Sequence, residues 1–98
     1  MDAAVDHYRS LLREQLPTLR NRWGVASLEV FGSRVRGEAR SDSDLDVLVT
    51  LEKPIGLFQF VELEARLTEL LGVKVDLVLR SALKPKIGER ILAEAIPV

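Results

Sequence analysis

Cysteine is absent from this sequence of 98 residues, and histidine occurs once. Without cysteine the chain cannot form a disulfide, a thiolate zinc site or a cysteine nucleophile. The longest apolar runs, such as Val47–Val49, fall far short of the roughly 18 residues that a membrane span requires. The first residues mix acidic and basic side chains where a signal peptide would need an apolar core. These absences predict a cytoplasmic protein with no membrane attachment.

A charge excess of either sign is missing as well. The 14 basic residues nearly balance the 15 acidic ones, so the formal net charge is -1 and the isoelectric point is near 5.8. General nucleic-acid binders usually carry a clear basic excess, so we expect no direct nucleic-acid binding. The length suits one domain with one core, and we treat residues 1–98 as a single domain.

Hydrophobic periodicity divides the chain into helical and extended segments. Apolar residues recur at helical spacing over residues 3–15 and 57–71. Pro17 suits a first helical position, so it predicts the start of a second, short helix that ends near Trp23. Three apolar, β-branched segments predict strands at residues 25–31, 45–51 and 73–79.

Two further elements are expected near the C-terminus. Pro85 opens a last helix to about Ala95, and residues 96–98 predict a short edge strand, where proline is tolerated. The order helix, strand, loop, strand, helix, strand, helix predicts an α/β (α+β) fold. We expect a small mixed sheet of three to four strands packed against helices.

The polar segment between the first two predicted strands contains the candidate chemistry, and two common motifs fail there on residue identity. Gly32 and Gly37 are spaced as in a phosphate-binding P-loop, but Glu38 stands where that loop needs lysine. Three aspartates in alternate positions begin like a calcium-binding loop. Val47 then stands where that loop needs glycine, and Lys53 where it needs glutamate. We therefore reject both motifs.

Asp44 and Asp46 stand two residues apart at the start of an apolar strand. Side chains at this spacing point to the same face of a strand, with Cα atoms about 6.6 Å apart, while the residues between them take the buried face. Asp76 lies within the next apolar strand, where an acid is costly to bury unless it is paired or metal-bound. If these strands are neighbours, the three carboxylates form a site of hard oxygen ligands that suits Mg²⁺. Such a trio of carboxylates can bridge two metal ions.

Ordinary structural explanations stay open for the individual residues. Asp46 alone could be a solvated strand end, since isolated acids are mostly exposed. Gly32 could be a turn glycine, and Arg34, Arg36 and Arg40 could be a solvated basic run. The two aspartates at period two, combined with an acid inside the next strand, favour the functional interpretation.

These residues resemble the signature of the DNA polymerase beta-like nucleotidyltransferase superfamily. Gly32–Ser33 is followed, after ten intervening residues, by Asp44–Asp46. The wider pattern of Phe31–Ser33, Arg36–Gly37 and Ser43–Asp46 is similar to the minimal, MntA-type nucleotidyltransferases of bacteria and archaea. The resemblance covers nearly the whole chain. Larger superfamily members carry helical lobes that hold the acceptor, and no such lobe is expected here.

The resemblance implies a role for each site residue. Asp44 and Asp46 would hold Mg²⁺ and the nucleoside triphosphate. Asp76, in the place of the family's third acid, would complete the metal site and help to activate the attacking hydroxyl. Gly32 would let the backbone approach the phosphates, which a Cβ would obstruct. The Ser33 hydroxyl would bond a β- or γ-phosphate oxygen.

The resemblance also implies the reaction and the partner. A hydroxyl would attack the α-phosphorus of ATP while the protein positions the reactants and neutralises charge. Arg36 is our candidate for stabilising the leaving pyrophosphate, a role beyond what the motif requires. The implied partner is an all-helical HEPN-domain toxin, which this chain would adenylylate on a tyrosine as its antitoxin.

Two other functions stay open at this point. The chain could neutralise a helical partner by contact alone, although contact does not need three acids. It could instead transfer a nucleotide to a small molecule, although the missing acceptor lobe argues against this. The sequence leaves open the identity of the partner, the acceptor residue, the nucleotide preference and whether the chain forms a homo-oligomer.

Overall fold

The N-terminal helix is a single element. In the computed structural model, which describes residues 3–40 and 42–98, α1 runs from Ala3 to Trp23. The predicted break at Pro17 was therefore wrong. Pro17 and Arg13, whose carbonyl loses its helical partner, are both exposed, so water can take the place of the missing bond. The helix continues because one face is buried on both sides of the proline, at Val5, Leu12, Leu19 and Trp23.

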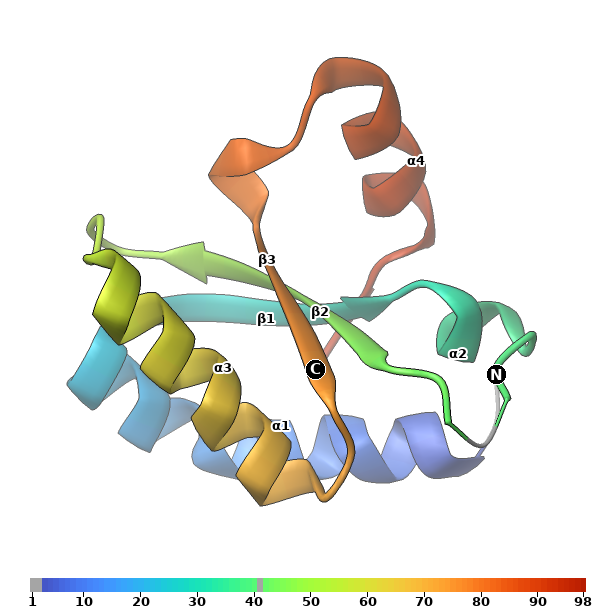
Figure 1. The fold of residues 1–98 in the computed structure, drawn as a ribbon, viewed down its shortest axis with the longest axis horizontal. Coiled ribbons are helices and arrows are strands. Elements are labelled where there is room, and N and C mark those ends of the chain that lie inside the picture. The colour runs from blue at the N-terminus through green and yellow to red at the C-terminus, as the bar shows by residue number, and fades with distance from the viewer. Residues whose placement is uncertain (1–2, 41) are drawn as a thin grey trace.

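Four strands form one mixed sheet in the order β3-β2-β1-β4 (Figure 1). β1 (Val25–Phe31) and β2 (Leu45–Leu51) are antiparallel, whereas β3 (Val75–Leu79) runs parallel to β2. β4 (Ile96–Pro97) pairs with the other edge of β1. The prediction of a small mixed sheet in an α/β fold is confirmed, although β3 begins two residues later than predicted.

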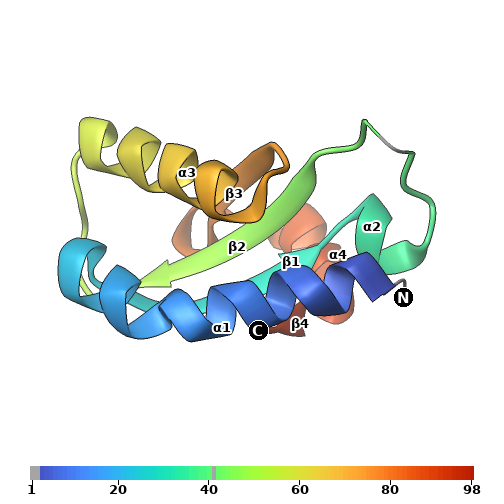
Figure 2. The same ribbon diagram turned by 90° about the horizontal axis from the view of Figure 1, so that it is seen from below.

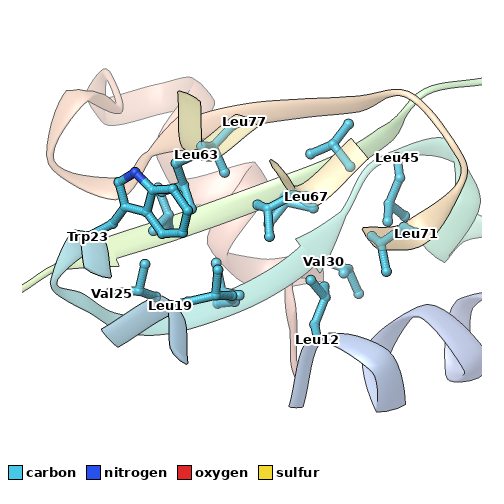
Figure 3. Packing of buried hydrophobic residues seen from close by; sticks show 14 of the residues in the cluster. Leu12, Leu19, Trp23, Val25, Val30, Leu45, Leu63, Leu67, Leu71 and Leu77 are labelled. Atoms are coloured by element: carbon cyan, nitrogen blue, oxygen red, sulfur yellow. The ribbon is translucent and has the colours of Figure 1, made fainter. Parts of the chain in front are cut away.

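Helices α1 and α3 (Leu57–Leu71) pack on the same face of the sheet (Figure 2). α3 ends at Gly72, whose φ of 69° is the left-handed conformation that glycine adopts at little cost. Side chains from both helices meet those of the sheet in one core (Figure 3), which includes Leu12, Leu19, Leu45, Val47, Leu63, Leu67 and Leu77.

The first turns of α3 carry apolar side chains that face solvent. Leu57, Phe58 and Val61 are exposed to 74%, 91% and 53%. A helix packed on a sheet buries one stripe, and here that stripe contains Leu63 and Leu67, so apolar residues on the other faces remain outside. None of the helices within the two described ranges combines the length and the hydropathy that a membrane span requires.

Two short helical turns were not predicted. α2 (Ser33–Arg36) follows β1, and a 3-10 turn, η1 (Arg80–Ala82), follows β3. Segments of three or four residues are too short for hydrophobic periodicity to reveal. α2 contacts both β1 and β2, so it folds the candidate segment back over the start of β2.

Helix α4 (Pro85–Glu94) lies on the side of the sheet opposite α1 and α3 (Figure 1). The chain that follows it is tied down at several points. β4 pairs with β1, and the guanidinium Nε atoms of Arg9 and Arg13 donate to the carbonyls of Pro97 and Val98, at 2.9 Å and 3.1 Å. These contacts anchor the C-terminal end of α4 beside the end of β1.

The core predicts how the fold responds to truncation of a buried side chain. Leu67 is fully buried between α3 and the sheet, so Leu67→Ala should lower the free energy of unfolding by about 2–5 kcal/mol. Leu57→Ala is the matched control on the same helix and should change it by less than about 0.5 kcal/mol. Urea unfolding measures both. Equal losses would contradict the packing of α3.

Candidate active site

Two of the predicted acids lie side by side because of the way β2 faces. Leu45 and Val47 are fully buried in the core, so Asp46 between them points to the opposite face. Asp46 and Asp76 are register partners in the parallel pairing of β2 and β3, and both neighbours of Asp76 in the strand are buried. The two carboxylates therefore leave the same face of the sheet from adjacent strands.

Asp44, the third predicted acid, lies just before β2. Its Oδ2 atom is 3.9 Å from Nζ of Lys74, which precedes β3. Within residues 3–40 and 42–98, no three His, Cys, Asp or Glu side chains are gathered closely enough to hold a metal ion as they stand. Asp44 is therefore near the Asp46–Asp76 pair, but the three carboxylates do not form a ready-made cluster.

Gly32 lies directly against the carboxylate of Asp46. Phe31, the last residue of β1, is the register partner of Asp46, so the chain leaves β1 beside that side chain. Gly32 has φ 85°, and a Cβ added there would overlap Asp46, with Cγ only 2.8 Å away. Glycine is thus required by both the backbone conformation and the Asp46 side chain. A turn alone would not need the second condition.

Arg34 holds the segment that leads into Asp44. The sequence left open that it belongs to a solvated basic run, but it is only 8% exposed. Its Nε and Nη2 atoms donate to the Ser43 carbonyl, at 3.1 Å and 2.5 Å, and its guanidinium lies 5.8 Å from the ring centre of Tyr8 on α1. Arg34 therefore has a structural role that its sequence context did not show.

A cleft of about 440 Å³ opens over the first turn of α2 and the start of β2. One wall of the cleft consists of residues from β1, β2 and α2. The other wall consists of residues from α4, which lies on the face of the sheet opposite α1 and α3. The lining residues are Phe31, Gly32, Ser33, Arg36, Asp46, Ile87, Arg90, Ile91 and Glu94. Four of the six predicted site residues thus line one cleft, while Asp76 is beside it as the strand neighbour of Asp46.

Glu94 reaches into this cleft from the last turn of α4. The backbone N–H of Gly32 donates to Glu94 Oε2 at 2.5 Å. Arg36 Nη1 donates to both carboxylate oxygens of Glu94, at 3.1 Å and 3.0 Å. Arg36 Nε donates to Glu38 at 3.1 Å. The carboxylate of Glu94 therefore contacts the Gly32 N–H and the Arg36 guanidinium, the two groups that we expected to contact phosphate.

The electrostatics of the cleft centre on Asp46. Partial burial, together with the negative charges of Asp76 and Asp44, raises the pKa of Asp46 to about 6. Arg36 opposes this shift and Glu94 adds to it. Hydrogen bonds to Glu38 and Glu94 raise the pKa of Arg36, so its guanidinium stays charged. Burial and the neighbouring carboxylates thus destabilise the ionised form of Asp46, and Arg36 offsets this effect only in part.

The donor set fits a divalent cation. Carboxylate oxygens are the ligands that Mg²⁺ prefers. A cation between Asp46 and Asp76 would offset both the burial and the repulsion that raise the pKa of Asp46. Asp44 could join them if its side chain turned away from Lys74. The three residues therefore suit the metal that the sequence predicted, after a local rearrangement of Asp44.

Sequence reasoning missed the contribution of α4. Arg90 and Glu94 line the cleft, together with the apolar side chains of Ile87 and Ile91. The sequence marks these positions only as parts of an amphipathic helix, and nothing local connects them to a motif that ends more than 40 residues earlier.

Comparisons with known proteins identify the family of this chain. A family model described as a nucleotidyltransferase domain matches residues 12–98. The protein adenylyltransferase MntA of Thermococcus cleftensis is 46% identical over 94 residues, which make up 96% of this chain and 95% of that protein. A Methanocaldococcus jannaschii protein assigned as a protein adenylyltransferase is 38% identical over 80 residues, 82% of each chain.

Solved structures share the fold. One assigned as a minimal nucleotidyltransferase superposes with a TM-score of 0.78 at 44% identity, over 100% of this chain and 97% of that one. A complex of a tri-AMPylated HEPN toxin with an MNT antitoxin, from Shewanella oneidensis, matches with a TM-score of 0.67 at 16% identity, over 94% of this chain and 69% of that one. The family model, the relatives and the shared fold show that this chain belongs to the nucleotidyltransferase family, in its minimal, MntA-type protein adenylyltransferase branch.

Proposed function

We propose that this chain transfers AMP from ATP to a tyrosine hydroxyl of a HEPN-domain toxin and so acts as its antitoxin. The observation that carries the proposal is the pairing of Asp46 with Asp76 on adjacent strands, beside Gly32 and Ser33 in one cleft. Contact alone would not require two carboxylates on the same face of adjacent strands, where burial and then the charge of Asp76 raise the pKa of Asp46.

The phosphate-binding side of the cleft consists of Gly32, Ser33 and Arg36. Gly32 has a backbone N–H that donates to the Glu94 carboxylate in the nucleotide-free protein, and Ser33 lines the cleft one residue later. Arg36 presents a charged guanidinium over the same space. A triphosphate placed here would have its β- and γ-phosphates against these donors and its α-phosphate toward Asp46.

Asp44, Asp46 and Asp76 would hold Mg²⁺, which when bound supplies positive charge to the triphosphate and to the attacking oxygen. Asp76 is exposed, so an acceptor hydroxyl can reach it from solvent. In our proposal Asp76 accepts the proton of that hydroxyl. The hydroxyl oxygen forms the new bond to the α-phosphorus as the bond to the β-phosphate oxygen breaks, and pyrophosphate leaves beside Arg36.

The partner follows from the relatives. The Shewanella oneidensis complex joins an MNT antitoxin to a tri-AMPylated HEPN toxin, and another solved toxin–antitoxin complex of similar fold holds AMP-PNP. We extend both features to this chain because its fold is shared and its identity to an MntA protein adenylyltransferase is 46%. ATP is then the nucleotide and a HEPN toxin the acceptor.

The direct test is incubation with ATP, Mg²⁺ and the HEPN protein from the neighbouring reading frame. If the product of that reading frame is the HEPN partner that we propose, it should gain the mass of one or more AMP groups. Asp76→Asn should lower the transfer rate by about 10²–10⁴ while most ATP binding remains, since losing a general base costs about that much. Asp42→Asn, an exposed acid outside the cleft, is the control. Neutralisation of the partner without any mass gain would show binding by contact instead.

Asp46→Asn should weaken binding of Mg²⁺–ATP and raise the stability of the nucleotide-free protein. The pKa of Asp46 is raised from about 3.8 to about 6, so its ionisation opposes folding, and stability falls as pH rises from about 4 to about 6. Because Asp46 is partly solvated, we expect a gain of only about 1 kcal/mol at pH 7, or roughly 4–8 °C in Tm. This gain should disappear below about pH 4. Thermal melts and calorimetric titration decide, and unchanged ATP affinity would contradict the assignment.

Ser33→Ala should reduce affinity for ATP more than affinity for AMP. Its hydroxyl is assigned to a β- or γ-phosphate, and a hydrogen bond to a charged oxygen is worth about 1.5–3 kcal/mol. The expected loss for ATP is therefore more than about tenfold. Ser81→Ala, on the exposed turn η1, should leave both affinities unchanged. Equal losses for ATP and AMP would place Ser33 elsewhere.

A further inference from the structure

The carboxylate of Glu94 holds the same donors that a triphosphate would need. It accepts from the Gly32 N–H at 2.5 Å and receives two bonds from Arg36 Nη1, at 3.1 Å and 3.0 Å. These contacts join residues separated by 62 and 58 positions in the sequence. The side chain of Glu94 is 25% exposed, so it is accessible to an incoming ligand.

The backbone around Glu94 is not free to move away. β4 begins two residues later and pairs with β1, and the Val98 N–H donates to the Leu28 carbonyl at 3.2 Å. Arg9 and Arg13 hold the carbonyls of the last two residues. A ligand that needs the Gly32 N–H must therefore displace the Glu94 side chain by rotation, with α4 and β4 left in place.

The charge of Glu94 works against any second anion in the cleft. It adds to the negative field that raises the pKa of Asp46. Arg90 lines the same cleft one turn earlier on α4 and makes no ion pair with any residue that the structure describes. Once Glu94 turns away, Arg36 and Arg90 both remain as cations for a polyphosphate.

We propose that Glu94 is an internal competitor of the β- and γ-phosphates of the bound nucleotide. This inference rests on the proposed function of the cleft as an ATP site. In the nucleotide-free protein Glu94 occupies the Gly32 N–H and Arg36. A triphosphate, which carries more negative charge and more acceptor oxygens than one carboxylate, displaces it. A ligand with only an α-phosphate does not reach these donors and leaves Glu94 in place.

The same competition acts on the product side of the reaction. Pyrophosphate left after transfer lies against Gly32 and Arg36, where Glu94 can return from its position on α4. Return of the carboxylate replaces the bonds that pyrophosphate loses and adds repulsion between the two anions. Glu94 therefore promotes release of pyrophosphate and opposes the reverse reaction, at the expense of ATP affinity.

The test compares Glu94→Gln with two charge-matched controls. Glu38→Gln removes the other partner of Arg36 but leaves the Gly32 N–H bonded to Glu94. Glu89→Gln removes one charge from an exposed position on α4 that does not line the cleft. Affinities for Mg²⁺–ATP, pyrophosphate and AMP are measured by calorimetric titration, and each variant is first checked by thermal melting.

We expect Glu94→Gln to bind ATP and pyrophosphate about tenfold more tightly, the change that corresponds to one charge-assisted hydrogen bond. Its affinity for AMP should stay within about twofold of the original, and both controls should match the unchanged chain. Pyrophosphate should also inhibit label transfer more strongly in Glu94→Gln. These three results together support the competitor role.

Other results separate this inference from the proposed function. If the unchanged chain binds ATP and Glu94→Gln binds it equally or more weakly, Glu94 is not a competitor and the ATP site stands. An equal gain for AMP, or an equal gain in Glu38→Gln, also overturns the competitor role, because the effect would then be general charge or the freeing of Arg36. If neither the unchanged chain nor any variant binds ATP, the proposed function fails with it.

Discussion

Strand β2 pairs with both β1 and β3, and its side chains alternate between the two faces of the sheet. The placement of Asp46 in the site depends on this alternation. Leu45, Val47 and Val49 are completely buried under α1 and α3, so the side chain of Asp46 must point to the opposite face of the sheet. A shift of register by one residue would place a carboxylate in the core and a valine in the cleft. The burial that stabilises the fold is thus the same constraint that aims the acid, and the fold cannot form with Asp46 facing inward.

Several carboxylates lie close together in and beside the cleft, and their negative charge affects the pKa of Asp46 and the contacts of Arg36. Asp46 and Asp76 are register partners, and burial of Asp46, followed by the negative charges of Asp76 and Asp44, raises its pKa. Arg36 is the nearest compensating cation, but Glu38 and Glu94 already engage it. In the nucleotide-free site, the positive charge of Arg36 is therefore shared with Glu38 and Glu94 and only partly offsets the carboxylates around Asp46. Such a site suits a ligand that arrives as a metal-bound polyanion.

Several features followed from local patterns. The bounds of β1, β2 and α3 were predicted correctly because each segment has a clear period and is closed by glycine or polar residues. The direction of Asp46 followed from the same period, because the residues on either side of it were expected to take the buried face. The continuous α1 was not predicted, since burial of one helix face against the rest of the fold holds the helix together across Pro17. The buried Arg34 was not predicted either, since a basic run gives the same local signal whether it lies on the surface or under another element.

The sequence by itself determined the strands, the face that Asp46 takes and the spaced glycine, serine and aspartates that mark the family. These are properties of short segments, where side-chain period and residue type act directly. Only the tertiary structure decided that Gly32 touches Asp46 and that Glu94 occupies the anion-binding donors, and it alone left Asp44 beside Lys74. Such contacts join positions far apart in the chain, and they arise because the pairing of β1 with β4 brings the end of α4 to the start of α2.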